Sequence, residues 1–490
     1  MTRRARGRAA GARAGRDGRS WRDRRGWRGE RAGRGGAGWA GRGGPKGTGA
    51  GRAGAPAIEE EEHHTAMSIK DRVDEVVAGL GGIRPELEGF YEDLHAHPEL
   101  GHQEHRTATR VAERLGSCGF QVHDGVGGTG VVGVLANGDG PTVLLRADMD
   151  ALPVREETGL PYASKAVGKD ASGREVPVAH ACGHDMHVTC LLGAARLLAA
   201  ARDAWRGTLV ALFQPAEEPG DGADGMLADG LTDLVPRPDV AFAQHVLPYP
   251  AGRVGTRAGS FLSAADNIRV TVHGRGAHGS APQAAIDPVV MASMIVVRLQ
   301  TIVSRELAAT RPAVLTVGSV QAGTSGNVIP ESAELLLNVR TYDEETRRAV
   351  LAAVRRIVTA ECAASGADRE PEVEEGTRFP PTVNDAAATR EVAAAFAEVF
   401  GEHAGTAELQ SASEDFSRIP DAFGVPYTYW ALGCVDPDAY EAARRGGTVA
   451  RDIPVNHSSR FAPVLQPTLD TGVRALVTAT LSRLAARDGA

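Results

Sequence analysis

Short apolar runs alternate with stretches of helical periodicity through the first half of the chain. Apolar positions repeat at helical spacing over residues 69–95, with a break at Gly81-Gly82, and again over residues 103–115 and 186–201. Apolar runs bounded by turn residues predict buried strands at residues 131–135, 143–145, 209–213 and 240–243. Strands that alternate with helices predict an α/β fold, in which a mostly parallel sheet is covered by helices on both faces.

A different pattern begins near Ser263. Strand character and helical character recur there in two units, with strands at residues 268–272, 314–317 and 335–339 and helices at residues 288–303 and 344–364. Such units predict a smaller α+β domain inserted into the first domain. The expected division is a larger domain at residues 67–262 and 373–490, with the inserted domain at residues 263–372.

The first 66 residues differ in composition from the rest of the chain. Residues 1–56 carry 15 Arg and one Lys against three acidic residues, whereas the whole chain has a formal net charge of −8. A Gly-interrupted arginine run cannot bury apolar surface, so residues 1–66 are predicted to be a disordered Arg/Gly-rich extension. The extension could bind RNA or serve as a transit peptide, but a dispensable segment upstream of a start at Met67 is the simpler interpretation.

Cysteine usage and hydropathy indicate in which cellular compartment the protein is expected. The five cysteines are widely spaced and odd in number, which argues against a disulfide framework. No run approaches the roughly 20 apolar residues of a membrane span, and the N-terminus has no apolar signal core. The sequence therefore predicts a cytoplasmic protein with no membrane partner.

Polar residues suited to catalysis follow the predicted strands. Arg146-Ala-Asp148-Met-Asp150 follows one strand, Gln214-Pro-Ala-Glu217-Glu218 follows a second, and Gln244-His245 follows a third. In open parallel sheets, ligands bind at the carboxyl ends of the strands. We therefore expect these side chains to meet at one edge of the sheet.

Several of these residue types are metal donors. The eight residues from His180 to His187 contain three imidazoles, the thiol of Cys182 and a carboxylate, which zinc-like ions prefer, although helix-capping residues would share this composition. In Glu217-Glu218, one carboxylate could bind a metal while the other deprotonates a water. Adjacent glutamates are otherwise common on solvated surfaces.

Histidines elsewhere in the chain would complete a metal site. His245 or His457 alone would more often be a structural residue, and His95 and His97, which precede Pro98, are interpreted as capping residues. Taken together, five residues supply enough donors for two metals if one ligand or a water bridges them: Cys182, His184, Glu218, His245 and His457.

Eight segments, in order from about residue 84 to residue 485, resemble the aminoacylase-like metallo-amidohydrolases. The similarity is greatest to the branch of hippurate hydrolases and indole-acetyl-amino-acid hydrolases. The segments are Asp93-Leu-His-Ala-His-Pro-Glu-Leu-Gly101, Arg146-Ala-Asp-Met-Asp-Ala-Leu-Pro153, His180-Ala-Cys-Gly-His-Asp185, Gln214-Pro-Ala-Glu-Glu218, Gly276-Ala-His-Gly279, Asn327-Val-Ile-Pro330, Ser413-Glu-Asp-Phe416 and Asn456-His457.

The resemblance implies a role for each matching residue. Glu217 would be the general base, and Asp148 would be a carboxylate that orients the catalytic residues. The inserted domain at residues 263–372 would be a lid that forms a homodimer. From this lid, His278 would reach the active site of the partner subunit and stabilise the oxyanion. Asn327 and Arg340, also in the lid, would contact the substrate carboxylate. Two divalent metal ions per subunit, Mn²⁺ or Zn²⁺, would be held by Cys182, His184, Glu218, His245 and His457.

The implied activity is hydrolysis of N-acyl or aryl-acyl amino acids to a carboxylic acid and an amino acid. A dipeptidase or carboxypeptidase on the same scaffold is an alternative. A non-catalytic binding protein whose tail engages nucleic acid is another, but the intact Glu217 and the five donors argue against it. Arg340 ends an alternating strand, where a solvated edge arginine is equally expected. Gln244 and Gln283 depart from residues common in the family, which puts detailed substrate preference in doubt.

Overall fold

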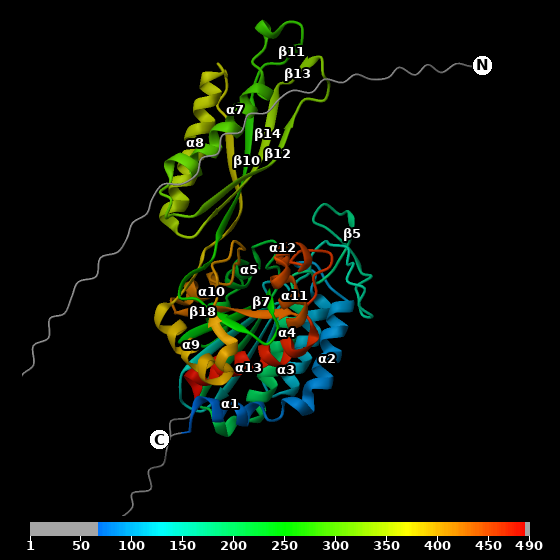
Figure 1. The fold of residues 1–490 in the computed structure, drawn as a ribbon, viewed down its shortest axis with the longest axis vertical. Helices are drawn as coiled ribbons and strands as arrows, with labels where there is room; N and C mark the ends of the chain where they lie inside the picture. The colour runs from blue at the N-terminus through cyan, green and yellow to red at the C-terminus, as the bar shows by residue number, and fades with distance from the viewer. Residues whose placement is uncertain (1–66, 486–490) are drawn as a thin grey trace, which may run out of the picture. The chain divides into compact units, whose positions relative to one another are not determined.

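The computed structural model describes residues 67–485, and an eight-stranded sheet forms the centre of their larger part (Figure 1). The strands, in spatial order, are β1 (Gln121–Val126), β2 (Gly130–Asn137), β6 (Gly207–Gln214), β3 (Thr142–Asp148), β7 (Val240–Pro250), β18 (Tyr427–Val435), β8 (Val254–Thr256) and β17 (Ala404–Thr406). The central neighbours β6, β3, β7 and β18 are parallel. The prediction of a mostly parallel sheet is therefore confirmed.

The four predicted strands lie inside β2, β3, β6 and β7, where apolar runs are buried from both sides. Residues 209–213 of β6, for example, are all fully buried. Leu145 and Leu209 belong to the apolar core on one face of the sheet, whereas Leu144 and Val210 belong to the core on the other. Successive side chains of a strand point to opposite faces, so a continuous apolar run indicates a sheet covered on both.

Helices cover the two faces of the central sheet. The first core contains residues from α1 (Ile69–Val77), α2 (Leu80–Ala96), α3 (His105–Ser117), α4 (His184–Ala200), α9 (Ala386–Phe400) and α13 (Leu465–Leu484). The second contains residues from α5 (Gly222–Ala228), α6 (Leu231–Leu234) and α10 (Arg418–Phe423). The break between the first two helices falls at Ala78-Gly79 rather than at Gly81-Gly82. Gly81 and Gly82 occupy the first turn of α2, where backbone N–H groups need no partner within the helix.

The second part of the fold is a four-stranded antiparallel sheet with order β12-β14-β10-β15. It consists of β10 (Ala264–His273), β12 (Ala313–Ala322), β14 (Ser332–Thr341) and β15 (Glu372–Phe379), and α7 (Pro288–Thr301) and α8 (Glu344–Ala364) share its apolar core. In Figure 1 both helices lie along this sheet. These elements have the strand and helix content predicted for the lid. The boundary at residue 372 stays a prediction, and it falls at the first residue of β15.

Shorter elements connect these layers. They are the hairpin β4 (Val167–Lys169) and β5 (Glu175–Pro177), the pair β9 (Gly259–Leu262) and β16 (Thr382–Asn384), the pair β11 (Ala277–His278) and β13 (Val328–Ile329), and the helices α11 (Pro437–Gly446) and α12 (Val449–Asp452). Both α7 and α8 begin at an aspartate cap, Asp287 and Asp343, whose carboxylates accept backbone N–H bonds of the first turn.

One helix in the described part of the chain, Pro288–Glu306, is long and apolar enough to cross a membrane by length and composition. It comprises α7 and the turn that follows. Met291, Ile295 and Leu299 are fully buried in the lid core. Its other side leaves Val290 57% and Val297 65% exposed. The helix is therefore a packed element of the lid with an additional apolar face.

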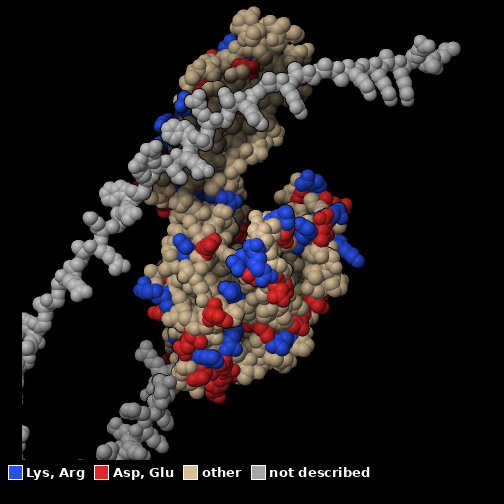
Figure 2. Space-filling model, viewed as in Figure 1, with Lys and Arg blue, Asp and Glu red and all other residues tan. Residues whose placement is uncertain are grey.

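Charged side chains are interspersed on the face of the molecule drawn in Figure 2. Among the described residues, charged side chains form ion pairs such as Arg106 with Asp93 at 2.7 Å and Arg444 with Glu441 at 2.6 Å. Nucleic acid surfaces are instead expected to gather positive charge in one region. On this face, the described residues do not form such a region.

The different burial of two leucines predicts that their substitutions change the free energy of unfolding by different amounts. Leu145 in β3 is fully buried, whereas Leu336 in β14 is 37% exposed. Leu145→Ala should lower the free energy of unfolding by about 2 to 5 kcal/mol, because the sheet and its helices cannot close on the cavity. Leu336→Ala should change it by about 0.5 kcal/mol. Urea denaturation compares them, and equal midpoints would contradict the assigned core.

Candidate metal centre and active site

A pocket of about 760 Å³ opens where the central parallel strands end, and residues from separate parts of the chain line it. Glu217 and Glu218 follow β6, and His245 lies on β7. Cys182 precedes α4, and His457 lies in the loop between α12 and α13. The strand ends therefore bring the predicted residues together at one edge of the sheet.

Three tight turns present these side chains. Gly183 has φ +86°, and a Cβ atom there would lie 2.4 Å from Val246 Cγ2, so only glycine allows Cys182 and the first residue of α4 to approach β7. Ala216 has φ +48°, and its N–H donates to Glu104 Oε1 at 2.8 Å. His457 has φ +70°. Positive φ is uncommon for non-glycine residues, and such strain is characteristic of functional sites.

Three of the other predicted metal donors, Cys182, His184 and His457, lie around the Glu218 carboxylate, whereas His245 is grouped with Asp148, His184 and His187. Ligand atoms of Cys182, Glu218 and His457 lie within 4.8 Å of one another, as do those of His184, Glu217 and Glu218. Glu218 Oε1 lies 3.3 Å from His457 Nε2 and 3.9 Å from His184 Nε2. Cys182 Sγ lies 3.5 Å from His245 Nε2. Glu218 therefore belongs to both groups, as a ligand near two cations would.

Unpaired buried atoms support the fit of a cation. His184 Nε2 and Glu218 Oε1 are buried without a hydrogen-bond partner. Leaving such groups unpaired costs stability, and a cation between them would satisfy both. The His245 ring donates from Nδ1 to the carbonyl oxygen of Val246 at 2.8 Å, which leaves the Nε2 lone pair for a metal. Imidazole, thiolate and carboxylate together suit Zn²⁺ or Mn²⁺.

Asp150 orients two of the donors directly. Its Oδ1 accepts from His184 Nδ1 at 3.2 Å, and its Oδ2 accepts from the N–H of Glu218 at 3.0 Å. The first bond leaves His184 Nε2 free to bind a metal. Sequence reasoning assigned the orienting role to Asp148 and missed Asp150. The alternation in Arg146-Ala-Asp148-Met-Asp150 was the available signal, since both aspartates follow the same strand.

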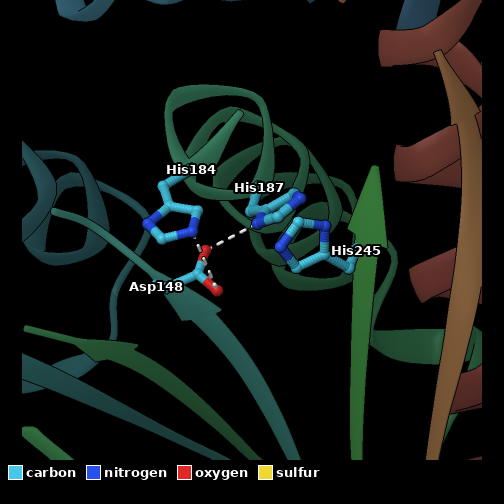
Figure 3. Close-up of side chains that lie close together, drawn as sticks. All are labelled: Asp148, His184, His187 and His245. Atoms are coloured by element: carbon cyan, nitrogen blue, oxygen red, sulfur yellow. Dashed lines mark hydrogen bonds and ion pairs between the residues drawn. The ribbon is translucent and has the colours of Figure 1, made fainter. Parts of the chain in front are cut away.

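Asp148 contacts two histidines (Figure 3): its Oδ2 lies 3.8 Å from His184 Nε2, and its Oδ1 contacts His187. His187 Nδ1 donates to Asp148 Oδ1 at 2.6 Å, and His187 Nε2 accepts the N–H of Val246 at 2.9 Å. Both ring nitrogens of His187 are therefore occupied, so His187 positions β7 next to His245 rather than offering a ligand. The orienting role of Asp148 stays a prediction, and the structure connects Asp148 to that strand.

Beneath the donors, the guanidinium of Arg146 lies in a buried group of carboxylates. It donates to Asp148 Oδ2 at 2.6 Å, to Glu414 Oε1 at 2.8 Å and to Gln214 Oε1 at 2.9 Å. Burial opposes its charge, but Glu414 and Asp148 hold the pKa of Arg146 well above its usual range. The hydroxyl of Tyr429 also donates to Glu414 Oε2, at 2.6 Å.

The environment of Glu217 suits a proton carrier. Burial, followed by the nearby carboxylates of Glu414 and Glu218, raises the pKa of Glu217 well above its ordinary value. Ligand atoms of Glu217, Glu414 and Asp415 lie within 4.8 Å of one another. A carboxyl group with an elevated pKa can both take and return a proton near neutral pH. Glu414 and Tyr429 were missed from the sequence, where only the Ser413-Glu-Asp-Phe416 match pointed to this region.

Of the three predicted lid residues, one lines the pocket and two lie elsewhere. Arg340 lines the pocket, where Nη1 donates to the carbonyl oxygen of Ser411 at 2.6 Å and to Ser413 Oγ at 3.2 Å. His278 and Asn327 do not line it, because they belong to the β11–β13 region, where His278 pairs with Val328. The exposed His278 accepts the N–H of Ser280 at Nδ1, which leaves Nε2–H as a free donor.

Comparisons with known proteins agree with this geometry. A family model described as peptidase family M20/M25/M40 matches residues 144–444. Thermostable carboxypeptidase 1 of Saccharolobus solfataricus is 38% identical over 345 residues, which cover 69% of this chain and 84% of that protein. Hippurate hydrolase of Campylobacter jejuni is 38% identical over 322 residues, which cover 65% and 80%. A Bacillus subtilis crystal structure, described as a dinuclear metal binding peptidase from the M20 family, is 29% identical with a TM-score of 0.66, covering 82% and 98%.

The contacts of Asp150 predict a loss of metal affinity in Asp150→Asn. The asparagine amide offers one acceptor oxygen where the carboxylate offers two, so His184 and Glu218 would lose their shared orientation. Metal affinity should fall about 10- to 100-fold, the usual effect of removing such a partner. Asp139→Asn, at an exposed aspartate, is the matched control. Metal content after dialysis against graded metal buffers measures the effect, and equal affinities would contradict the orienting role of Asp150.

Proposed function

The chain belongs to peptidase family M20/M25/M40, whose members hydrolyse amide bonds, and on that premise we propose that it cleaves N-acyl or aryl-acyl amino acids. The products are a carboxylic acid and an amino acid. The observation that carries the proposal is one pocket whose lining includes four of the metal donors, the carboxyl group of Glu217 and the guanidinium of Arg340, with the fifth donor, His184, grouped with Glu217 and Glu218. The hippurate hydrolase of Campylobacter jejuni supports the substrate class.

Cys182, His184, Glu218, His245 and His457 would hold two divalent cations, Mn²⁺ or Zn²⁺. Bound there, the cations would lower the pKa of a coordinated water and polarise the amide carbonyl. Glu217 accepts a proton from the attacking water and returns it to the leaving nitrogen. The elevated pKa of Glu217 allows both transfers. Asp150 keeps His184 and the backbone of Glu218 aligned meanwhile.

Arg340 would hold the carboxylate of the amino acid. Its Nε donates to Asn338 Oδ1 at 3.1 Å, so three protein acceptors fix the guanidinium in the pocket wall. These bonds use Nε and Nη1, so Nη2 remains to donate a charge-assisted bond to a carboxylate, which favours substrates that carry one. Asn327 would assist from the lid of a partner subunit. Its side chain accepts from Ser325 Oγ at 2.7 Å in this chain.

A homodimer is part of the proposal. The exposed apolar face of α7, with Val290, Met294 and Val297 between 49% and 65% exposed, would be covered by a second subunit. In that assembly His278 would donate from Nε2 to the oxyanion in the neighbouring active site. All five cysteines are free thiols, which agrees with a cytoplasmic location.

A carboxypeptidase is the second candidate, since the thermostable carboxypeptidase 1 of Saccharolobus solfataricus is 38% identical to this chain. The same base and donors would serve both reactions. The two functions differ in the group on the acyl side of the bond, which is a peptide in one and a carboxylic acid cap in the other.

The proposed function is tested on purified protein with hippurate, N-acetyl amino acids, indole-acetyl conjugates and free dipeptides. Turnover should be fastest on the capped amino acids. Removing the metal should abolish it, and adding Mn²⁺, Co²⁺ or Zn²⁺ should restore it, because the water is activated by the cations. Faster cleavage of peptides would favour the carboxypeptidase, and undiminished turnover in metal-free protein would refute the mechanism.

Substitutions of Glu217 and Glu218 are expected to have different effects on turnover and metal content. Glu217→Gln should keep its metal and lose about 10² to 10⁴ in kcat, the usual contribution of a general base. Glu218→Gln should lose metal, because Glu218 belongs to both donor groups. Elemental analysis alongside kinetics distinguishes them. The reverse pattern would exchange the two roles.

His278 is expected to act across the dimer. His278→Ala should lower kcat by about 10² to 10³, the scale of one lost oxyanion donor, with unchanged metal content. Mixing this variant with Glu217→Gln and allowing subunits to exchange should restore part of the activity. One site of the mixed dimer would combine an intact base from one chain with an intact histidine from the other. Verified heterodimers without recovery would exclude action across the interface.

A further inference from the structure

A second cavity of about 700 Å³ lies next to the active-site pocket. Two chain segments line one cavity and then the other. Leu247 and Pro248, near the end of β7, line the active-site pocket, and Tyr249 and Pro250 line the second cavity. In β17 and the loop that follows it, residues 404–408 line the second cavity and residues 410–414 line the active-site pocket.

One side-chain pair lies at the boundary. The amide nitrogen of Gln410, in the active-site pocket, donates to the hydroxyl oxygen of Tyr249, in the second cavity, at 2.8 Å. The same nitrogen donates to the carbonyl oxygen of Glu408 at 3.0 Å. Both side chains are only partly buried. A hydrogen bond between two partly solvated side chains is a small barrier compared with burial of a large apolar ligand group.

The position of Arg340 indicates which part of a substrate would meet this boundary. Arg340 Nη1 donates to the carbonyl oxygen of Ser411, the residue after Gln410. In the proposed function Arg340 holds the carboxylate of the amino acid, and the present inference rests on that assignment. The side chain of that amino acid, rather than the acyl group, would then lie nearest to Gln410.

The lining of the second cavity suits an apolar occupant. Tyr249, Pro250, Val254 and Tyr440 contribute apolar or aromatic surface. Of its charged residues, Arg444 and Glu441 are already paired, with two N–H bonds at 2.6 and 2.7 Å. An aromatic or long aliphatic side chain could therefore bury its surface there without displacing that ion pair.

We propose that the Tyr249–Gln410 hydrogen bond is a size filter on the amino-acid side of the substrate. While the bond is closed, the active-site pocket receives small amino acids. When it opens, the second cavity becomes a subsite for a large apolar side chain. Tyr249 and Gln410 would then determine specificity without contributing to the chemical step.

The experiment compares N-benzoylglycine with N-benzoylphenylalanine, which share an acyl group, on the full-length metal-loaded protein. Gln410→Ala and Tyr249→Phe both remove the bond. In each, the ratio of kcat/KM for the phenylalanine substrate to that for the glycine substrate should rise roughly tenfold or more. Tyr440→Phe is the matched control, because it removes a hydroxyl from the same cavity and leaves the Tyr249–Gln410 hydrogen bond in place, and its ratio should equal that of the wild type.

A second substitution tests whether the gain uses the second cavity. Thr406 lines that cavity and is exposed, so Thr406→Trp would fill it from the edge of the sheet. When it is combined with Gln410→Ala, Thr406→Trp should return the ratio of kcat/KM values to that of the wild type. An unchanged ratio in both single variants, or a rise that survives Thr406→Trp, would overturn the inference alone. No turnover of either substrate by the wild type would overturn the proposed function together with this inference.

Discussion

The buried guanidinium of Arg146 is the interaction on which the active site depends. Asp148, Glu414 and Asp415 surround it at 2.6 to 3.4 Å, and all four side chains are almost completely buried. Carboxylates this close would repel one another in a low-dielectric interior without a cation between them. Removing one partner of such a group typically costs about 3 to 5 kcal/mol, because the remaining charges stay buried and unpaired.

That charged group sets the positions of the catalytic side chains. Asp148 connects it through His187 to the backbone of Val246, beside His245. Glu414 connects it to Glu217, whose pKa it helps to raise after burial. The buried charge of Arg146 is thus linked through Asp148 and His187 to the strand that carries His245, and it also contacts Glu414, which lies beside Glu217, the proposed base.

The lid sequence reaches the pocket through few contacts. Arg340, on β14, donates to Ser411 and Ser413 of the second catalytic segment. Next to them Gln410 closes the boundary with the second cavity. In the proposed function, the chemical step therefore uses side chains at the ends of buried strands, whereas substrate selection uses loop and lid side chains that are more exposed. This division lets specificity vary while the buried charges stay in place.

The sequence by itself determined the strands and most helices, because apolar periodicity acts over a few neighbouring residues, and short motifs such as His180-Ala-Cys-Gly-His184 led to the five proposed metal donors. Only the tertiary structure decided which carboxylate faces which histidine. Asp148 and Asp150 are alike in sequence, yet Asp150 contacts His184. Arg146 and Glu414 are 268 residues apart, and their pairing depends on the packing of distant strands and loops, which no local pattern encodes.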